Sequence, residues 1–277
     1  MGLIFPALEP FPQPKIIRSQ YPVVLMHGFG MLGSIRRNGM LDDAAMYLRS
    51  RGVQAFAPNV VPYHRIEERA RMWRNHLLTA LEMTDAKGLH LIAHSMGGLD
   101  ARYVIAELNG ASYIRSLTTI STPHHGTYLA QYSLDQPSLV RDITVSFMDR
   151  MGEMAYPHAA SDALSALQEL TPAFLNDTFN PSIPNHPDVL YQSYSARAGA
   201  GTPVPIFPTM LLSNAILHRA EGANDGIVSE KSGRWGNHLG VLDADHARQI
   251  GIANRENGFQ ANRFMADLVT DLATKTF

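Results

Sequence analysis

A serine between an apolar run and a helical pattern is the residue of this sequence best suited to covalent chemistry. Ser95 lies in the segment LIAHSMGG, with small residues two positions before it (Ala93) and two positions after it (Gly97). A sharp strand-to-helix turn requires small side chains at these two positions, although glycine is usual where Ala93 stands. The turn holds the hydroxyl clear of the sheet at a helix N-terminus. We therefore predict Ser95 as a nucleophile. The alternative is a plain turn in which Ser95 is the helix N-cap.

An attacked carbonyl carbon leaves a negative oxygen, which two preorganised N–H groups normally bind. In a turn of this kind the residue after the serine, Met96, supplies one of them through its backbone. The second is expected in the glycine-rich segment 27–30, directly after the apolar run 21–26, and we assign it to the N–H of Phe29. His27 is expected to stiffen this loop by hydrogen bonding. A glycine-rich turn that only closes a strand is the alternative.

A serine hydroxyl is a weak nucleophile until a histidine takes its proton. In the strand–turn–helix arrangement the order along the chain is serine, then acid, then histidine. The base is therefore expected late in the sequence, in a loop before the last helix. His246 is the favoured base, and His238 is the second choice.

A carboxylate must fix the tautomer of that histidine and stabilise its cation. Asp225 lies in the turn NDGIV, between Ser95 and His246, and is the favoured acid. Asp243 and Glu221 are the alternatives. A turn that uses Asn-Asp-Gly only for its backbone conformation would need no catalytic role.

Short apolar runs predict buried strands, and helical patterns lie between them. The expected strands are 21–26, 53–57, 89–93 and 114–120, and the expected helices are 66–84 and 97–109. The arginines of 65–74 are interrupted by Glu67 and Glu68, which predicts a solvated helix face. Alternating strands and helices predict an α/β fold, with a mostly parallel central sheet covered by helices on both faces.

Residues 128–187 interrupt this alternation with helical stretches and predict a cap inserted over the carboxyl ends of the strands. A return strand at 189–195, a Gly/Pro-rich loop at 198–208 and a last helix at 259–274 complete a single domain of residues 1–277. The cap carries apolar residues from Val140 to Tyr156, including Ile143, Phe147, Met148, Met151 and Met154. They either pack on the sheet or open to bind acyl chains.

Composition narrows the function classes. The chain of 277 residues has 45% hydrophobic and 17% charged residues, which suits a globular domain. A net charge of −2 gives no field that attracts nucleic acid, and the absence of cysteine excludes thiolate metal sites and disulfides. No run approaches the ~18 apolar residues of a membrane-spanning helix. The first residues lack a basic stretch and contain prolines, so we expect a cytoplasmic protein or export by a signal-free route.

Five segments in this order resemble the bacterial triacylglycerol lipases of Pseudomonas, Burkholderia and Proteus. They are YPVVLMHGFG (21–30), AHSMGG (93–98), STPHHGT (121–127), NDGIV (224–228) and Asp245-His246. The resemblance implies an α/β-hydrolase fold with a helical lid and the hydrolysis of water-insoluble acylglycerols. It maps the nucleophile, acid and base onto Ser95, Asp225 and His246, and the oxyanion donors onto Phe29 and Met96.

The chain departs from that family at a metal site. Many of these lipases bind a structural calcium, and one ligand is an aspartate two residues after the catalytic histidine. Arg248 stands there in this chain, and 198–208 holds no carboxylate. A hard cation needs several oxygen ligands, so we predict no metal and no cofactor. His124 and His125 are adjacent, and their diverging side chains do not predict a zinc site.

The sequence therefore predicts a serine hydrolase that cleaves carboxylic esters through an acyl-enzyme. Its expected partner is an ester or lipid substrate, met at a lipid–water interface, and it is a lipase or carboxylesterase. Acyl transfer, polyester cleavage or thioester hydrolysis would use the same residues, because a fold does not determine its substrate. A catalytically silent binding protein of the same fold is the least favoured interpretation.

Overall fold

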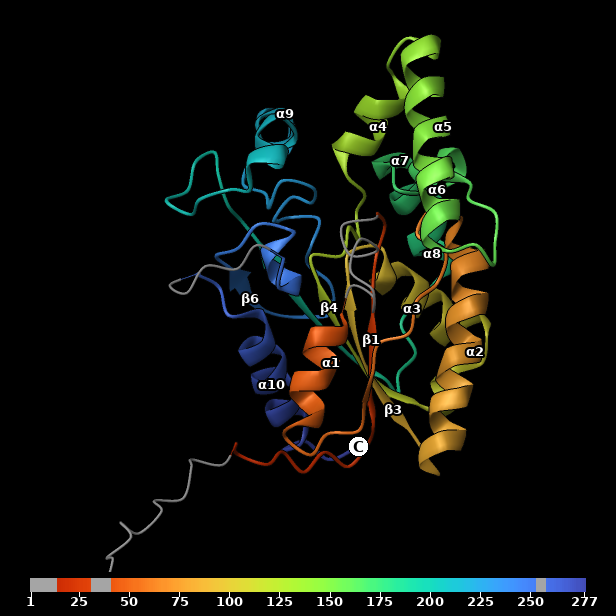
Figure 1. Cartoon of the computed structure of the whole chain (residues 1–277), viewed down its shortest axis with the longest axis vertical. Coiled ribbons are helices and arrows are strands. Elements are labelled where there is room, and N and C mark those ends of the chain that lie inside the picture. Colours follow the sequence, from red (N-terminus) through yellow and green to blue (C-terminus); the bar gives the residue numbers. More distant parts are fainter. Residues whose placement is uncertain (1–13, 31–40, 253–257) are drawn as a thin grey trace, which may run out of the picture.

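The computed structural model of the protein describes residues 14–30, 41–252 and 258–277. Most of the proline-containing N-terminal segment discussed above, residues 1–13, lies outside the described residues. The described part forms one layer of strands between two layers of helices, with further helices at one end of the sheet (Figure 1).

Six parallel strands form the central sheet, in the order β2-β1-β3-β4-β5-β6. Their bounds are β1 (Val23–Met26), β2 (Ala55–Phe56), β3 (Leu89–His94), β4 (Ile114–Ile120), β5 (Leu190–Ala196) and β6 (Asn237–Leu242). Met26 of β1 pairs with Ala93 of β3, and His94 of β3 pairs with Ile120 of β4. The loops that follow β1, β3 and β4 therefore start side by side at one edge of the sheet.

Helices cover both faces of this sheet, which confirms the predicted fold class. On one side α1 (Asp42–Arg49) packs against α10 (Ala261–Leu272), and on the other α2 (Ile66–Thr84) packs against α3 (Gly97–Glu107) (Figure 1). Strand β3 contributes to both cores because its side chains alternate. Ile92 belongs to the cluster with α1 and α10, whereas Leu91 and Ala93 belong to the cluster with α2 and α3.

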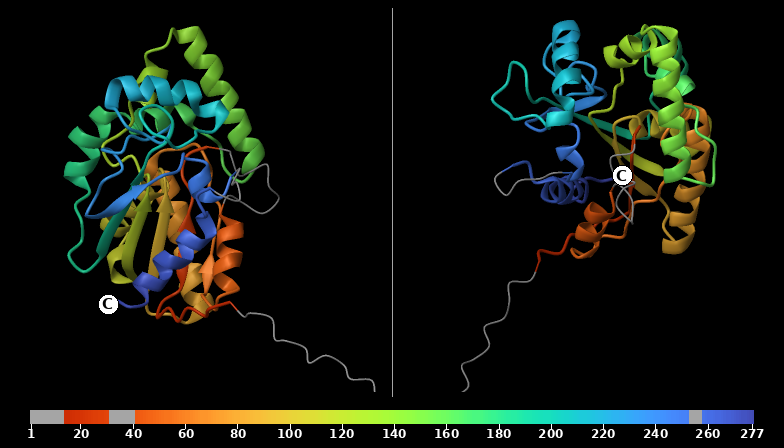
Figure 2. Two further views of the ribbon diagram at one scale, coloured as in Figure 1. Left: turned by 90° about the vertical axis from the view of Figure 1, so that its left-hand side faces the viewer. Right: turned by 45° about the horizontal axis from the view of Figure 1, so that its top comes forward.

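Between β4 and β5 the chain forms a group of helices beyond the carboxyl ends of the strands (Figure 2). They are α4 (Tyr128–Leu134), α5 (Ser138–Ala155), α6 (Ala163–Glu169), α7 (Pro172–Phe174), a π-helical turn (Leu175–Phe179) and α8 (Asn180–Ser182). Helix α9 (Leu211–Glu221), between β5 and β6, lies at the same end. Short 3₁₀ turns are present at Gly110–Ser112, Pro208–Met210 and Arg248–Ile250.

Three elements, α1, α9 and β6, were not expected from the sequence. The side chains of β6 alternate between exposed and partly buried, because this strand is the last of the sheet and pairs only with β5 among the described strands. An edge strand needs no apolar run, and this one contains Gly240 and His238 instead. The predicted strands and the three predicted helices at 66–84, 97–109 and 259–274 are present with small shifts of their ends.

Candidate active site

Ser95 lies in the turn between β3 and α3, and its backbone is left-handed, with φ of +56°. A non-glycine residue in this region costs on the order of 1–3 kcal/mol and needs support from its surroundings. The support is local. The N–H of Ser95 donates to the carbonyl of Ile120 at 3.0 Å, and its own carbonyl accepts from Thr122 Oγ1 at 2.7 Å. The predicted turn is therefore present, and Ser95 is not a helix N-cap.

The neighbours of Ser95 must be small because backbone lies against them. A Cβ added at Gly97 would come within 2.7 Å of the carbonyl oxygen of His27. A Cβ at Gly28 would lie 2.4 Å from Cβ of Ser95 and 2.8 Å from the backbone nitrogen of Met96. The loop after β1 thus rests directly on the serine turn, and the predicted donors Met96 and Phe29 lie on the two segments in contact.

A fully buried arginine orients the loop after β1. Arg69, in the first turn of α2, donates through Nη2 to the carbonyls of His27 at 2.9 Å and Gly28 at 3.3 Å. A trans peptide directs its C=O and N–H to opposite sides. Because the Gly28 carbonyl faces Arg69, the N–H of Phe29 in the same peptide faces away from it. No described residue accepts a hydrogen bond from the N–H of Phe29 or of Met96.

His27 supports the same peptide as a neutral ring. Its Nε2 accepts from the N–H of Val60 at 3.1 Å, so the proton lies on Nδ1 and is donated to the Gly28 carbonyl at 3.0 Å. Burial, followed by the charge of Arg69, lowers the pKa of His27 to about 3. His27 therefore stiffens the loop, as its position in the sequence suggests.

Arg69 corrects the expectation that residues 65–74 form only a solvated helix face. Its guanidinium pairs with the buried carboxylate of Asp100 at 2.8 Å, and the same Asp100 oxygen accepts from the Trp73 indole N–H at 3.1 Å. A signal for this burial is present in the spacing. Arg69 lies three residues after Ile66 and four before Trp73, and both of these side chains are buried.

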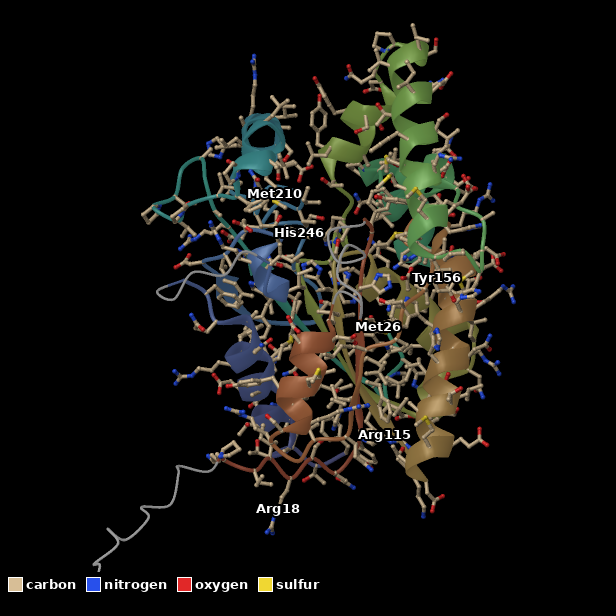
Figure 3. All side chains as sticks on the ribbon, in the orientation of Figure 1. Arg18, Met26, Arg115, Tyr156, Met210 and His246 are labelled. Carbon is tan, nitrogen blue, oxygen red and sulfur yellow. The ribbon has the colours of Figure 1, made fainter. Side chains whose placement is uncertain are left out.

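His246 and Asp225 meet in the structure. Nδ1 of His246 lies 2.7 Å from Oδ2 of Asp225, and the backbone N–H of His246 donates to the Asp225 carbonyl at 3.0 Å. Nε2 of His246 is buried and has no hydrogen-bond partner among the described residues. Figure 3 shows His246 between the level of Met26, where β1 ends, and the level of Met210, which directly precedes α9.

The carboxylate of Asp225 is held ionised. Its Oδ1 accepts from the backbone N–H groups of Ile227 at 3.0 Å and Val228 at 2.8 Å, and Oδ2 accepts from Gln249 at 2.8 Å besides His246. Burial opposes the charge, but the interactions with His246, the backbone and Gln249 prevail and lower the pKa of Asp225.

The alternative base and acids lie elsewhere. His238 is on β6, where its ring contacts the hydroxyls of Ser193 and Ser195. Asp243 is exposed and pairs with Arg197, and Glu221 accepts from the backbone N–H of Tyr128. None of these side chains is joined to His246 or Asp225 in the part of the chain that the structure describes.

Ser95 and His246 line the same cavity, which has a volume of about 590 Å³. Its walls come from the sheet edge, from α4, α5 and α6 and from α9, and they are mostly apolar. The apolar lining residues include Phe29, Tyr63, Leu129, Ala130, Met148, Leu167, Leu170, Leu212, Ile216, Ile227 and Val228. An apolar space next to a free imidazole nitrogen and a serine hydroxyl suits an acyl chain with its carbonyl at Ser95.

Arg248 stands where the related lipases have a calcium ligand, and it forms a buried ion pair. Arg248 Nη1 lies 2.8 Å from Oδ2 of Asp245 and also donates to the carbonyl of Pro205. Asp245 accepts in addition from the backbone N–H of Phe207 at 3.0 Å. The loop 198–208 is thereby fastened to the segment that carries His246. No group of three potential metal ligands occurs within residues 14–30, 41–252 and 258–277.

His124 and His125 both lie near the Trp235 ring but form different hydrogen bonds. The ring of His124 is fully buried, lies against Trp235 and contacts Thr119 Oγ1 at 3.0 Å, and burial lowers its pKa well below the usual range. His125 contacts Oδ1 of Asn176 at 2.9 Å. The two side chains therefore share no hydrogen-bonding partner among the described residues.

The amino-acid sequence of the chain is similar to those of thioesterases and lipases. Residues 22–168, a little over half of the chain, match the family described as palmitoyl protein thioesterase. Triacylglycerol lipase 2 of Saccharomyces cerevisiae is 34% identical over 218 residues, which are 76% of this chain and 61% of the yeast protein. The triacylglycerol lipase of Pseudomonas fragi is 25% identical over 259 residues, 83% of this chain and 86% of that protein.

The fold is shared with solved lipases. The structure of lipase 1 from Pelosinus fermentans superposes with a TM-score of 0.68 at 18% identity, covering 94% of this chain and all of that chain (100%). The chain spans between 49% and 61% of the length of the first curated relatives that it matches.

Replacing Arg69 with methionine should lower the free energy of unfolding by about 3–5 kcal/mol, because Asp100 would stay buried without its partner. The measurement is urea denaturation followed by circular dichroism. Arg71→Met is the matched control, since Arg71 forms an exposed pair with Glu67 and should change stability by less than about 0.5 kcal/mol. The double substitution Arg69→Met with Asp100→Leu should recover part of the loss. Equal stability of the Arg69 and Arg71 variants would contradict a supporting role for this ion pair.

Proposed function

This chain belongs to the lipase family of α/β-hydrolases, and from that premise we propose that it is a serine hydrolase that cleaves carboxylic esters of acylglycerols. The observation that supports this most directly is the hydrogen bond of 2.7 Å between His246 and Asp225. Nε2 of His246 has no partner among the described residues, and His246 lines the same cavity as Ser95. A nucleophile, a base and an orienting acid on three different loops are what acyl transfer to serine requires.

The reaction follows from these positions. Ser95 Oγ attacks the ester carbonyl carbon while His246 Nε2 takes its proton, and the carbonyl oxygen becomes an oxyanion. The N–H groups of Met96 and Phe29 bind that oxyanion, each contributing about 3 kcal/mol to the transition state. Collapse breaks the ester bond, and His246 gives the proton to the departing alcohol. Water then attacks the acyl-enzyme in the same way, which releases the acid and restores Ser95.

Asp225 orients His246 and stabilises its protonated form in both half-reactions. It accepts a hydrogen bond from the Nδ1–H of His246, which keeps that proton on Nδ1 and leaves Nε2 unprotonated, and it stabilises the imidazolium that forms. Four hydrogen bonds to its carboxylate keep it anionic, so the base keeps its partner down to acidic pH.

Acylglycerols are favoured as substrates because apolar surface surrounds the site. The cavity provides apolar walls for an acyl chain. Outside it, α5 exposes Leu139, Val140, Ile143, Phe147 and Met154, and α9 exposes Leu211 beside Leu212, which is exposed at the edge of the cavity. Exposed apolar patches on a monomer mark surfaces that contact lipid or protein. These features support action at a lipid–water interface by an inserted cap that spans about residues 128–187. None of the described helices is long and apolar enough to cross a membrane.

Thioester hydrolysis is the second candidate, because the family matched by residues 22–168 is described as palmitoyl protein thioesterase. An acyl thioester would place the same acyl carbonyl at Ser95 and differ only in the leaving group. The two activities are separated by comparing turnover of an ester and a thioester with the same acyl chain.

A fluorophosphonate probe should label the wild type and fail to label Ser95→Ala, which should also lose at least about a thousandfold in ester hydrolysis. Labelling is read by mass spectrometry of the intact protein. Ser133→Ala is the matched control, because Ser133 lines the same cavity and has no part in the reaction. Equal labelling of wild type and Ser95→Ala would remove Ser95 as the nucleophile.

Turnover of p-nitrophenyl esters should rise from the acetyl ester towards long acyl chains, and an emulsified triacylglycerol should be hydrolysed. Each CH₂ buried in the cavity adds up to ~0.8 kcal/mol of binding. Phe147→Ser should reduce hydrolysis of the emulsion more than hydrolysis of a dissolved ester, whereas Met83→Ser, also exposed, should affect neither. Highest activity on the acetyl ester with none on the emulsion would argue against acylglycerols, and faster cleavage of a palmitoyl thioester would favour the second candidate.

Activity and melting temperature should be unchanged by excess EDTA and by added calcium. Arg248 supplies a cationic group within the protein that joins Asp245 to the 198–208 loop. The measurement is ester hydrolysis with thermal denaturation before and after chelation, with a calcium-dependent hydrolase as positive control. Loss of activity that calcium restores would show that a metal site exists.

A further inference from the structure

A buried glutamine joins the acid of the proposed triad to the strand that precedes the nucleophile. Gln249 lies in the 3₁₀ turn Arg248–Ile250, three residues after His246, and is fully buried. Its Nε2 donates to Oδ2 of Asp225 at 2.8 Å, the same oxygen that accepts from His246. Its Oε1 lies 3.2 Å from Nε2 of His94.

These contacts determine how the amide is turned. An amide nitrogen only donates and an amide oxygen only accepts, so a carboxylate on one side requires a donor on the other. His94 is that donor and carries its proton on Nε2. Burial, followed by the charge of His246, lowers the pKa of His94 well below the usual range, so the ring is neutral. With both ends satisfied, the amide cannot rotate by half a turn without losing both hydrogen bonds.

His94 also contacts the base directly. Its ring centroid lies 4.4 Å from that of His246, with an angle of 45° between the planes. Because His94 is the last residue of β3 and precedes Ser95, one buried chain of contacts runs from the nucleophile turn through His94 and Gln249 to Asp225. Neither His94 nor Gln249 lines the cavity, so both residues contact the proposed triad from outside the space proposed for the substrate.

We infer that Gln249 and His94 are positioning residues, which hold the carboxylate of Asp225 and limit how much of its negative charge is directed at His246. The inference rests on the proposed function. Oδ2 accepts hydrogen bonds from both His246 and Gln249. The hydrogen bond to Gln249 therefore weakens the stabilisation that Oδ2 gives to the imidazolium formed during the reaction. Removing the Gln249 donor leaves more of the charge for His246 and makes its protonated form easier to reach.

The other charged or titratable groups nearby come from the same two loops and from β3. The charged ones are Asp225 and the Asp245–Arg248 ion pair, in which each charge has its partner, and the neutral titratable one is His94. Replacing Gln249 with leucine or methionine changes none of these charges, so a shift in the pH profile of these two variants reports the hydrogen bond to Asp225.

The experiment compares Gln249→Leu, Gln249→Met and Gln249→Glu with the wild type in the profile of kcat/KM against pH on a soluble ester. The neutral variants should lose about tenfold in kcat, the effect of one hydrogen bond to a charged group, with KM unchanged. Their acidic limb should move to higher pH. Gln249→Glu adds a second carboxylate beside Asp225 and should move the limb further in the same direction.

The matched control is Gln192→Leu, the same substitution at a buried glutamine on β5 outside this network. It should leave the acidic limb where the wild type has it. For His94, the variant His94→Phe keeps a ring of similar size without the donor. Its effect should not add to that of Gln249→Leu in the double variant, because both break the same chain of contacts.

The outcomes separate the two proposals. A wild type that hydrolyses no ester and takes up no fluorophosphonate would overturn the proposed function and this inference with it. An active wild type whose acidic limb is matched by all three Gln249 variants would overturn the inference alone. Lower kcat without a shift of the limb would mean that Gln249 only fills space. Thermal denaturation of each variant shows that it is folded at the assay temperature, and the two neutral variants test the point independently.

Discussion

The left-handed backbone of Ser95 is the constraint on which the rest of the site depends. It is stable only because three segments lie against it: β4 through Ile120, the following loop through Thr122, and the loop after β1 through Gly28. These segments start at adjacent strand ends because β1, β3 and β4 are neighbours in the sheet. The order of the strands therefore produces both the strained turn and the contact between the two segments that hold the proposed oxyanion donors.

Local sequence patterns predict the parts of this arrangement that depend on short spacing. The apolar run before Ser95 and the small residues on either side of it predict a strand, a sharp turn and a helix, and the structure has all three. The turn that contains Asp225 and the late position of His246 are likewise read from order along the chain, and the structure brings the two side chains together. Their catalytic roles remain a proposal.

Long-range hydrogen bonds could not be predicted in the same way. Arg69 reaches residues about forty positions earlier and Asp100 thirty-one later, and no periodicity relates these positions. Gln249 meets His94 across 155 positions. Strand β6 was missed for a different reason, since an edge strand with exposed positions lacks the apolar run by which buried strands are recognised. Such contacts depend on where the sheet places its loops, which a single sequence does not specify.

Two buried ion pairs complete the geometry, one at the loop after β1 and one next to His246. Arg69 and Asp100 hold the loop after β1 through its carbonyl oxygens, and Arg248 and Asp245 hold the segment of His246 through the carbonyl of Pro205. A buried pair adds little net stability over apolar residues, but losing one partner is costly because the other charge stays unpaired. Each guanidinium also binds backbone carbonyls, which an apolar side chain could not do. The ion pairs are therefore better understood as devices that fix two loops relative to the sheet than as contributions to overall stability.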